Sequence, residues 1–186
     1  MTNTVIIVAS GIGKRFCSTI PKQFVLYENK TILEHTIEKF EHHALIDNIV
    51  VVINENHKEI FYDIIKKNNY KKISNIAYGG KERFDSVYNG LLAIENKPEN
   101  VLIHDGVRPF VSERIITDWI NALQQYQAVS VGIKSVDTIM QIKDNMVIKL
   151  DKRETYRRVQ TPQCFKYELI KNAYSMAKDE NKFDFT

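Results

Sequence analysis

Two glycines and two separated cations follow the first apolar run of this 186-residue sequence. The stretch VASGIGKRFCSTIPKQF, residues 8 to 24, contains Gly11, Gly13, Arg15 and, directly after Pro21, Lys22. Glycine has no Cβ, so backbone N–H groups can approach a phosphate closely. Arginine offers phosphate oxygens a planar fork of donors, and lysine offers a compact charge. The pattern predicts a cradle for a polyphosphate, although cations on an ordinary surface loop would look the same.

Two common nucleotide-binding motifs do not fit this loop. A Walker loop requires G-x-x-x-x-G-K-[ST], which is absent, and a dinucleotide fingerprint requires a third glycine where this chain has Phe16. The absence of both motifs therefore argues against a P-loop nucleoside triphosphatase and against a dinucleotide-dependent dehydrogenase.

Two further segments combine glycine with charge. GGKERFDSVYNGL, residues 79 to 91, carries Arg83 and Ser86 at the start of an expected helix, where a solvated arginine and a capping serine are the simpler interpretations. VLIHDGVRPF, residues 101 to 110, ends an apolar run with Asp105 and Arg108. An aspartate at such a strand end can orient a substrate hydroxyl or approach a metal ion. His104 is expected to point back into the fold.

The elements that must position these loops form an alternating pattern. Apolar runs at 4–9, 48–53, 72–77, 100–104 and 128–133 are separated by amphipathic segments. Continuous Val/Ile runs separated by helices are typical of a parallel sheet with both faces covered. Five of the seven glycines follow the carboxyl ends of these runs, which is the edge where open α/β sheets bind ligands. The sequence predicts an open α/β fold whose site lies at that edge.

Local signals support two helices and an arm. Thr31 and Glu34 form a capping box, and Ser112 is placed to cap a second helix. Residues 135 to 159 include TIMQIK and MVIKL around Asp144-Asn145, which predicts two strands joined by a tight turn. We expect residues 135–159 to project from the sheet and to serve as an oligomer contact.

Length, charge and cysteine content narrow the class of protein. A chain of 186 residues is expected to form a single domain, 1–186. Lysine and arginine number 26 against 23 acidic residues, a balance too weak to argue for nucleic acid. The sequence has no apolar run of membrane length and no signal peptide, so we expect a cytoplasmic protein without a membrane partner. Cys17 and Cys164 have no metal-binding spacing.

Several motifs in order resemble one enzyme family. They are VASGIGKRF with PKQF, GGKERFDSVYNGL, HDGVRPFV, VDTI and QTPQCF (160–165). Together they resemble the cytidylyltransferases that make CDP-linked polyols, a family that comprises 2-C-methyl-D-erythritol 4-phosphate cytidylyltransferase and ribitol-5-phosphate cytidylyltransferase. The resemblance spans the chain and implies a Rossmann-like nucleotidyltransferase fold, a homodimer joined through the arm, and Mg²⁺-dependent transfer from CTP to a polyol phosphate.

The resemblance also implies roles for individual residues. Arg15 and Lys22 match the catalytic cations beside the α-phosphate of CTP. Positions that match the CTP-binding set are Ala9, Ser10, Gly11, Gly13, Gly80, Lys81, Arg83, Ser86 and Gly106. Positions that match polyol-phosphate contacts are Asp105, Arg108, Thr138, Arg153 and Thr161, with Arg153 reaching the neighbouring subunit's site. No firm metal ligand is expected: phosphates would hold most of the Mg²⁺ coordination, with Asp105 assisting.

The resemblance implies methylerythritol phosphate as the acceptor, with ribitol phosphate as the alternative, and several departures from the family pattern bear on that choice and on the activity. Ser10 stands where the family has Ala or Gly, and SVDTI (135–139) with ETYRRV (154–159) is as close to the ribitol enzyme, whereas HDGVRPF and SVYNGL favour methylerythritol. The family pattern continues past Thr186 with an acidic segment, a strand and a late lysine, so we expect this chain to lack that segment. A module that binds CTP without turning it over is compatible with the same motifs, and so is a nucleotidyltransferase for another base or a sugar 1-phosphate.

Overall fold

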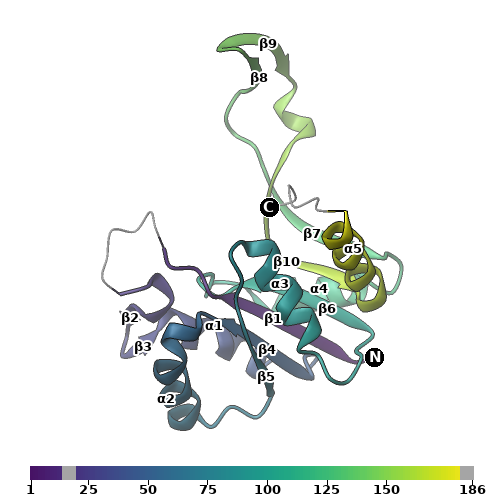
Figure 1. Ribbon diagram of the computed structural model, residues 1–186. Coiled ribbons are helices and arrows are strands. Elements are labelled where there is room, and N and C mark those ends of the chain that lie inside the picture. Colours follow the sequence, from purple (N-terminus) through teal and green to yellow (C-terminus); the bar gives the residue numbers. More distant parts are fainter. Residues whose placement is uncertain (14–19, 181–186) are drawn as a thin grey trace.

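The computed structural model describes residues 1–13 and 20–180 (Figure 1). Within these residues, six strands form the main sheet in the order β5-β4-β1-β6-β10-β7. Their bounds are β1 (Asn3–Ala9), β4 (Asn48–Ile53), β5 (Ile73–Tyr78), β6 (Asn100–Asp105), β7 (Ala128–Lys134) and β10 (Arg157–Lys166). Strands β5, β4, β1 and β6 pair in parallel, and β10 runs antiparallel to both β6 and β7. The mostly parallel α/β sheet predicted from the apolar runs is confirmed.

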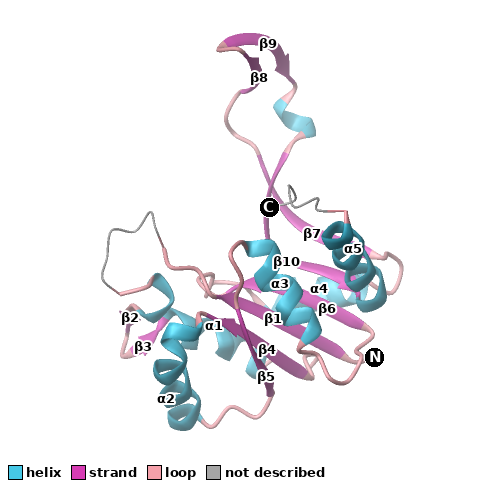
Figure 2. Ribbon diagram, viewed as in Figure 1, coloured by secondary structure: helices cyan, strands magenta, loops and turns pink. Residues whose placement is uncertain are grey.

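Helices cover both faces of the sheet because alternate strand residues point in opposite directions. Val5 and Ile7 of β1 lie in one core, with α1 (Ile32–Glu41), α2 (Lys58–Asn68) and α4 (Glu113–Ala122). Ile6 lies in the other core, with α3 (Arg83–Leu92) and α5 (Tyr167–Asp179), which lie in front of the sheet in Figure 2. Burying one such side chain fully contributes about 1.5–3 kcal/mol. These two cores hold the strand ends, and hence the loops that follow them, in fixed positions.

The predicted helix starts are confirmed. Thr31 Oγ1 accepts a hydrogen bond from Glu34 N at 3.1 Å, and Thr31 N donates to Glu34 Oε2 at 2.6 Å. Ser112 Oγ accepts from the Ile115 backbone N–H at 3.4 Å. These bonds satisfy N–H groups that a helix start leaves without partners.

Short elements connect the first loop to α1. They are the 3-10 turn η1 (Lys22–Phe24) and the strands β2 (Leu26–Tyr27) and β3 (Lys30–Thr31). A second 3-10 turn, η2 (Glu55–His57), precedes α2. No helix in the part of the chain that the structure describes has the length and apolar character needed to cross a membrane.

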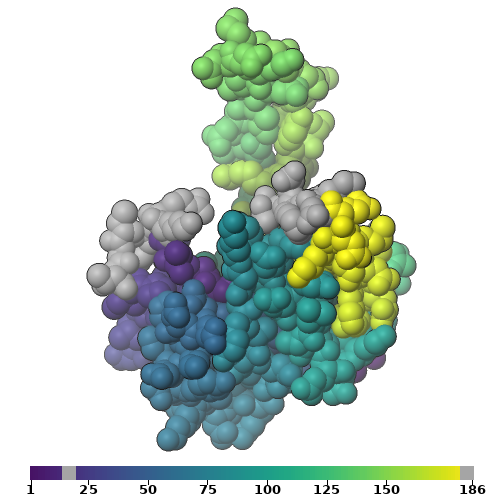
Figure 3. Space-filling view, in the orientation of Figure 1, coloured from purple at the N-terminus to yellow at the C-terminus, as the bar shows by residue number. Residues whose placement is uncertain are grey.

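The arm forms as predicted but ends differently. Strands β8 (Ile139–Lys143) and β9 (Met146–Asp151) pair antiparallel around Asp144 and Asn145, whose φ angles are 49° and 60°. The 3-10 turn η3 (Arg153–Thr155) follows, and the hairpin projects away from the sheet (Figure 3). The predicted boundary at 159 is corrected, because β10 begins at Arg157 and returns the chain to the main sheet.

Candidate functional site

The loops singled out in the sequence meet at one edge of the sheet. Val8 of β1 is in register with Asp105 of β6, and Ala9 is in register with Ile53 of β4, which pairs with Tyr78 of β5. Because these strands are parallel, the loops after β1, β5 and β6 all leave from their carboxyl ends. The antiparallel β10 brings its first half to the same edge, since its Gln163 pairs with Ile103.

Ser86 joins the loops that follow β1 and β5. Its Oγ accepts hydrogen bonds from Ser10 Oγ at 2.9 Å and from Gly80 N at 3.2 Å, and donates to Glu82 O at 3.1 Å. The side chain is 2% exposed. The capping interpretation of Ser86 is wrong, because α3 begins at Arg83 and its N-cap residue is Glu82. Ser86 instead links the loop after β5 to Ser10 in the loop after β1, which lies 76 residues from Ser86 in sequence.

Two glycines allow the loops to approach closely. A Cβ on Gly79 would lie 2.2 Å from Ser10 Cβ, and a Cβ on Gly106 would lie 2.8 Å from Ala9 Cβ. Both separations are far below van der Waals contact, so only glycine fits there without a shift of the neighbouring strand. Among residues 1–13 and 20–180, no atom lies within 4 Å of a Cβ placed on Gly11. The described part of the chain therefore leaves room beside the Gly11 backbone.

The remaining predicted CTP-binding positions lie along these loops. Gly13 has a φ of 67°, and Lys81 is exposed between Gly80 and Glu82. Gly106 N donates to Val8 O at 2.8 Å, and its carbonyl accepts from Thr36 Oγ1 at 2.9 Å.

Of the two predicted catalytic cations, one lies in the described part of the chain. Lys22 is the first residue of η1, directly after Pro21, whose φ is −58°. Arg15 falls outside the described residues. Sequence reasoning missed the next residue, Gln23, whose Nε2 donates to Ala9 O at 2.7 Å and to Gly11 O at 3.0 Å. The sequence feature that could have indicated a role for Gln23 is its position in the PKQF segment, next to the predicted cation Lys22.

Asp105 contacts residues from both predicted sets, the one for CTP and the one for the polyol phosphate. Arg83 Nε and Nη2 donate to Asp105 Oδ1 at 3.3 and 3.2 Å, and Arg108 Nε donates to Asp105 Oδ2 at 2.9 Å. Arg108 Nη1 also donates to Gln160 Oε1, and Asp105 N donates to Thr161 Oγ1 at 3.2 Å. Four of these five residues were predicted separately, on three different motifs, and the structure brings them together.

The negative charge of the Asp105 carboxylate is stabilised by Arg83 and Arg108. Burial raises the pKa of the Asp105 carboxyl, but hydrogen bonds from Arg108 and the charge of Arg83 outweigh that effect and hold the pKa below its usual value. Asp105 is therefore ionised at neutral pH and fixes both guanidinium groups. The imidazole of His104 is fully buried and faces inward as predicted, with Nε2 bonded to Arg108 O at 3.0 Å.

The last two predicted residues lie on the arm, not at the sheet edge. Thr138 is exposed just before β8. Arg153 lies in η3, and its Nη1 donates to Val136 O at 2.9 Å. Arg153 also lines a cavity of about 400 Å³ whose other residues are Lys134, Ser135, Val136, Glu154 and Arg157. Within one chain, no hydrogen bond or ion pair among the described residues joins Thr138 or Arg153 to Asp105 or Arg108.

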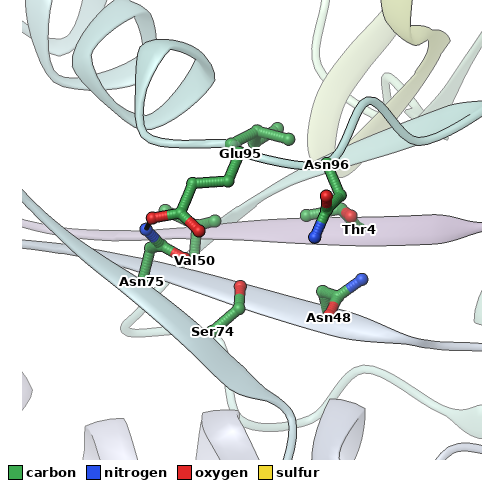
Figure 4. A pocket seen from close by; sticks show the side chains of 8 residues that line it. Thr4, Asn48, Val50, Ser74, Asn75, Glu95 and Asn96 are labelled. Atoms are coloured by element: carbon green, nitrogen blue, oxygen red, sulfur yellow. Dashed lines mark hydrogen bonds between the residues drawn. The ribbon is translucent and has the colours of Figure 1, made fainter.

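A second cavity lies at the opposite edge of the sheet (Figure 4). Its volume is about 90 Å³, and it is lined by Thr4, Asn48, Val50, Ser74, Asn75, Ile94, Glu95 and Asn96. That volume is far below the roughly 300 Å³ at which small-molecule sites begin, so this cavity is not a candidate nucleotide site. Across residues 1–13 and 20–180, no group of three or more His, Cys, Asp or Glu side chains is arranged to hold a metal ion.

Comparisons with known proteins agree with the resemblance of the motifs. The family model of 2-C-methyl-D-erythritol 4-phosphate cytidylyltransferase (IspD) matches residues 3–186. A Clostridium botulinum protein of that name is 48% identical over 97% of this chain and 79% of its own length. A Haemophilus influenzae protein, the bifunctional ribulose 5-phosphate reductase/CDP-ribitol pyrophosphorylase Bcs1, is 40% identical over 94% of this chain and 38% of its own length.

A solved structure resembles the whole chain. The crystal structure of 4-diphosphocytidyl-2C-methyl-D-erythritol synthase from Anaerococcus prevotii superposes with a TM-score of 0.84 at 32% identity, covering 100% of this chain and 78% of that one. The family model matches nearly every residue of the chain, and a solved structure that is 32% identical has the same fold. The chain therefore belongs to the 2-C-methyl-D-erythritol 4-phosphate cytidylyltransferase family.

Proposed function

We propose that this protein transfers the cytidylyl group of CTP to 2-C-methyl-D-erythritol 4-phosphate and releases pyrophosphate. An oxygen of the polyol phosphate attacks the α-phosphorus of CTP, and the bond from that phosphorus to the bridging oxygen of the β-phosphate breaks. The observation that carries the proposal, beside family membership, is the convergence of the loops after β1, β5 and β6, with their glycines and cations, at one sheet edge.

This reaction explains the kinds of residue found there. A phosphate monoester has a second pKa near 6 and is already mostly dianionic at neutral pH, so the attacking oxygen needs no general base. The protein must instead bring two anions together and stabilise the charge that develops during transfer. Backbone N–H groups, arginines and a lysine meet those two requirements.

We assign roles to residues within this proposal. Arg15 and Lys22 flank the α-phosphate as catalytic cations, and the loops that Ser86 joins hold the rest of CTP. Asp105, Arg108 and Thr161 bind the polyol phosphate. The fixed Arg83–Asp105–Arg108 group supports this division, because it lies between the two sets of loops.

Nucleotidyl transfer of this type generally uses a divalent metal, and we propose Mg²⁺. Both carboxylate oxygens of Asp105 already accept hydrogen bonds from arginines. The residues of this edge therefore fit an ion held mainly by phosphate oxygens. Asp105 would assist only through Oδ2, which accepts one hydrogen bond, whereas Oδ1 accepts two. When bound, Mg²⁺ neutralises phosphate charge.

We further propose a homodimer formed through the arm. Five apolar side chains of the hairpin are 55–70% exposed: Ile142, Met146, Val147, Ile148 and Leu150. A two-stranded hairpin with so many exposed apolar groups is marginal in water without a partner surface. In the dimer, Thr138 and Arg153 would reach the site of the partner subunit.

The activity is tested by measuring pyrophosphate release from CTP and Mg²⁺ with 2-C-methyl-D-erythritol 4-phosphate. UTP and ATP serve as nucleotide controls. D-Ribitol 5-phosphate tests the second candidate acceptor. We include it because the chain is 40% identical to the bifunctional CDP-ribitol pyrophosphorylase. Release with ribitol phosphate alone would replace the acceptor, and CTP binding with no release would indicate a binding module.

The cation role is tested with Lys22→Ala, using the exposed Lys66→Ala on α2 as the matched control. We expect turnover to fall far more than CTP affinity, because the charge should act mainly on the transition state. Unchanged turnover would contradict the assignment.

The dimer is tested by mixing subunits. Arg153→Ala mixed with Lys22→Ala should recover part of the lost activity, since hybrid dimers contain one site with both residues intact. Absence of recovery despite verified subunit exchange would count against a shared site.

A further inference from the structure

Gln23 lies between the predicted phosphate loop and the turn that carries Lys22. The side chain is 3% exposed, and its Nε2 donates to the carbonyl oxygens of Ala9 and Gly11 at 2.7 and 3.0 Å. Both partners are acceptors only, so the amide nitrogen and not the amide oxygen must face them. Gln23 thus uses both of its N–H hydrogens on the backbone of one short loop.

The turn that carries Gln23 is anchored elsewhere as well. Phe24 N donates to Pro21 O at 2.9 Å, and Val25 N donates to Lys22 O at 3.2 Å, which closes the turn. The Phe24 ring is 6% exposed in the core shared with α1, and Ile32 N donates to Val25 O at 3.0 Å. The turn is therefore held by α1, whereas the loop after Ala9 continues from β1.

The bonds of Gln23 also set the direction of the loop's peptide groups. In a trans peptide the C=O of one residue and the N–H of the next point in opposite directions. With the Ala9 and Gly11 carbonyls turned toward Gln23, the N–H groups of Ser10 and Ile12 point away from it. A loop that binds phosphate requires this arrangement, because carbonyl oxygens repel an anion and N–H groups attract it.

We propose that Gln23 is a positioning residue for cytidylyl transfer. It holds the phosphate loop with its carbonyls turned away from the substrate and sets the distance from that loop to Lys22. This role rests on the proposed function and deepens it, since it names the side chain that couples the loop to the cation.

A double-mutant cycle tests the coupling. Gln23→Met keeps the length of the side chain and removes both donors, and Gln124→Met makes the same change at an exposed position just after α4. We expect Gln23→Met to lower kcat/KM by about 10- to 100-fold, the scale of a small misplacement of a catalytic group. In a Lys22→Ala background the same change should lower kcat/KM by less than about threefold, because the cation it positions is gone. Gln124→Met should leave both values unchanged.

A second variant separates positioning from packing. Gln23→Glu places a carboxyl near two carbonyls, where its pKa is expected to rise, and only the protonated form can donate a hydrogen bond. Activity relative to wild type should therefore increase as the pH falls from about 8 to about 6, whereas Gln23→Met should show a constant ratio. This series gives a result even if thermal unfolding shows that Gln23→Met is poorly folded.

The outcomes distinguish this role from the proposed function. Additive effects of Gln23→Met and Lys22→Ala on log kcat/KM, together with a pH-independent Gln23→Glu ratio, would refute the positioning role while leaving the transferase intact. A wild-type protein that releases no pyrophosphate with either polyol phosphate would refute the proposed function, and this role of Gln23 with it.

Discussion

His104 should make the protein lose stability under mild acid. The imidazole is fully buried, with Nε2 bonded to Arg108 O at 3.0 Å, and Nδ1 is buried with no hydrogen-bond partner in the part of the chain that the structure describes. Because the carbonyl only accepts, Nε2 carries the proton, and a second proton on Nδ1 would have no acceptor. Burial lowers the pKa of His104 from 6.5 to about 4, although the bond to Arg108 O and the charge of Asp105 act in the opposite direction.

Proton linkage sets the direction and the size of this change in stability with pH. Between pH 6.5 and pH 4 the unfolded chain binds a proton at His104 and the folded chain does not, so stability falls as the pH falls through that window. Between about pH 7.5 and about pH 5 this single group should lower the free energy of unfolding by about 2 kcal/mol. For a protein of this size, that is a decrease in Tm of roughly 4–8 °C.

The comparison variant is His104→Gln, which keeps a donor for Arg108 O and does not titrate. Urea unfolding of both proteins at about pH 7.5 and about pH 5 gives two pH-dependent changes, and their difference isolates His104, since His35, His42, His43 and His57 are common to both. We expect the wild type to lose about 2 kcal/mol more than the variant. Equal losses in the two proteins would refute the reasoning, whatever the stability of the variant at neutral pH.

Three further changes test other parts of the structure. Asp105→Asn removes the negative charge shared by two arginines and should lower the free energy of unfolding by about 1.5–3 kcal/mol at neutral pH. This difference should shrink below about pH 4, where the wild-type carboxyl becomes protonated. Denaturant titrations at neutral pH and below about pH 4 measure both values. Gly90→Ala should destabilise by about 1–3 kcal/mol despite better helix propensity, because the added Cβ would lie 2.7 Å from Ile6 Cγ2 and 2.9 Å from Val52 Cγ2; a raised Tm would contradict this. Thr31→Ala breaks the capping box of α1 and should cost about 1 kcal/mol in urea unfolding, with an unchanged midpoint counting against the cap.

Strand β10 illustrates what the pattern of residues could not reveal. RRVQTPQCFK begins with two arginines and contains a proline, so it lacks the apolar run by which the other main-sheet strands were predicted. It becomes a strand because β6 and β7 offer it pairing partners on both sides. A pattern read along one segment does not contain those partners, and the arm was consequently predicted to extend into the start of β10.

Gln23 and Ser86 show the same limit within the candidate site. A glutamine in a polar loop is ordinarily solvated, and a serine near a helix start is ordinarily a cap. Their actual partners, the carbonyls of Ala9 and Gly11 and the hydroxyl of Ser10, lie 12 to 76 residues away. Long-range contacts of this kind depend on how β1 and α3 pack, which residue type alone does not specify.

The sequence by itself determined the alternation of strands and helices, the location of glycine and charge after the strands, and the family. Those properties are local: periodicity sets which face is apolar, and parallel strands joined by helices must place their carboxyl ends at one edge. Only the tertiary structure decided that Arg83 and Arg108 share one carboxylate, that Gln23 holds the first loop, and that Ser86 links the loops after β1 and β5. Each of these depends on distances between segments that packing alone brings together.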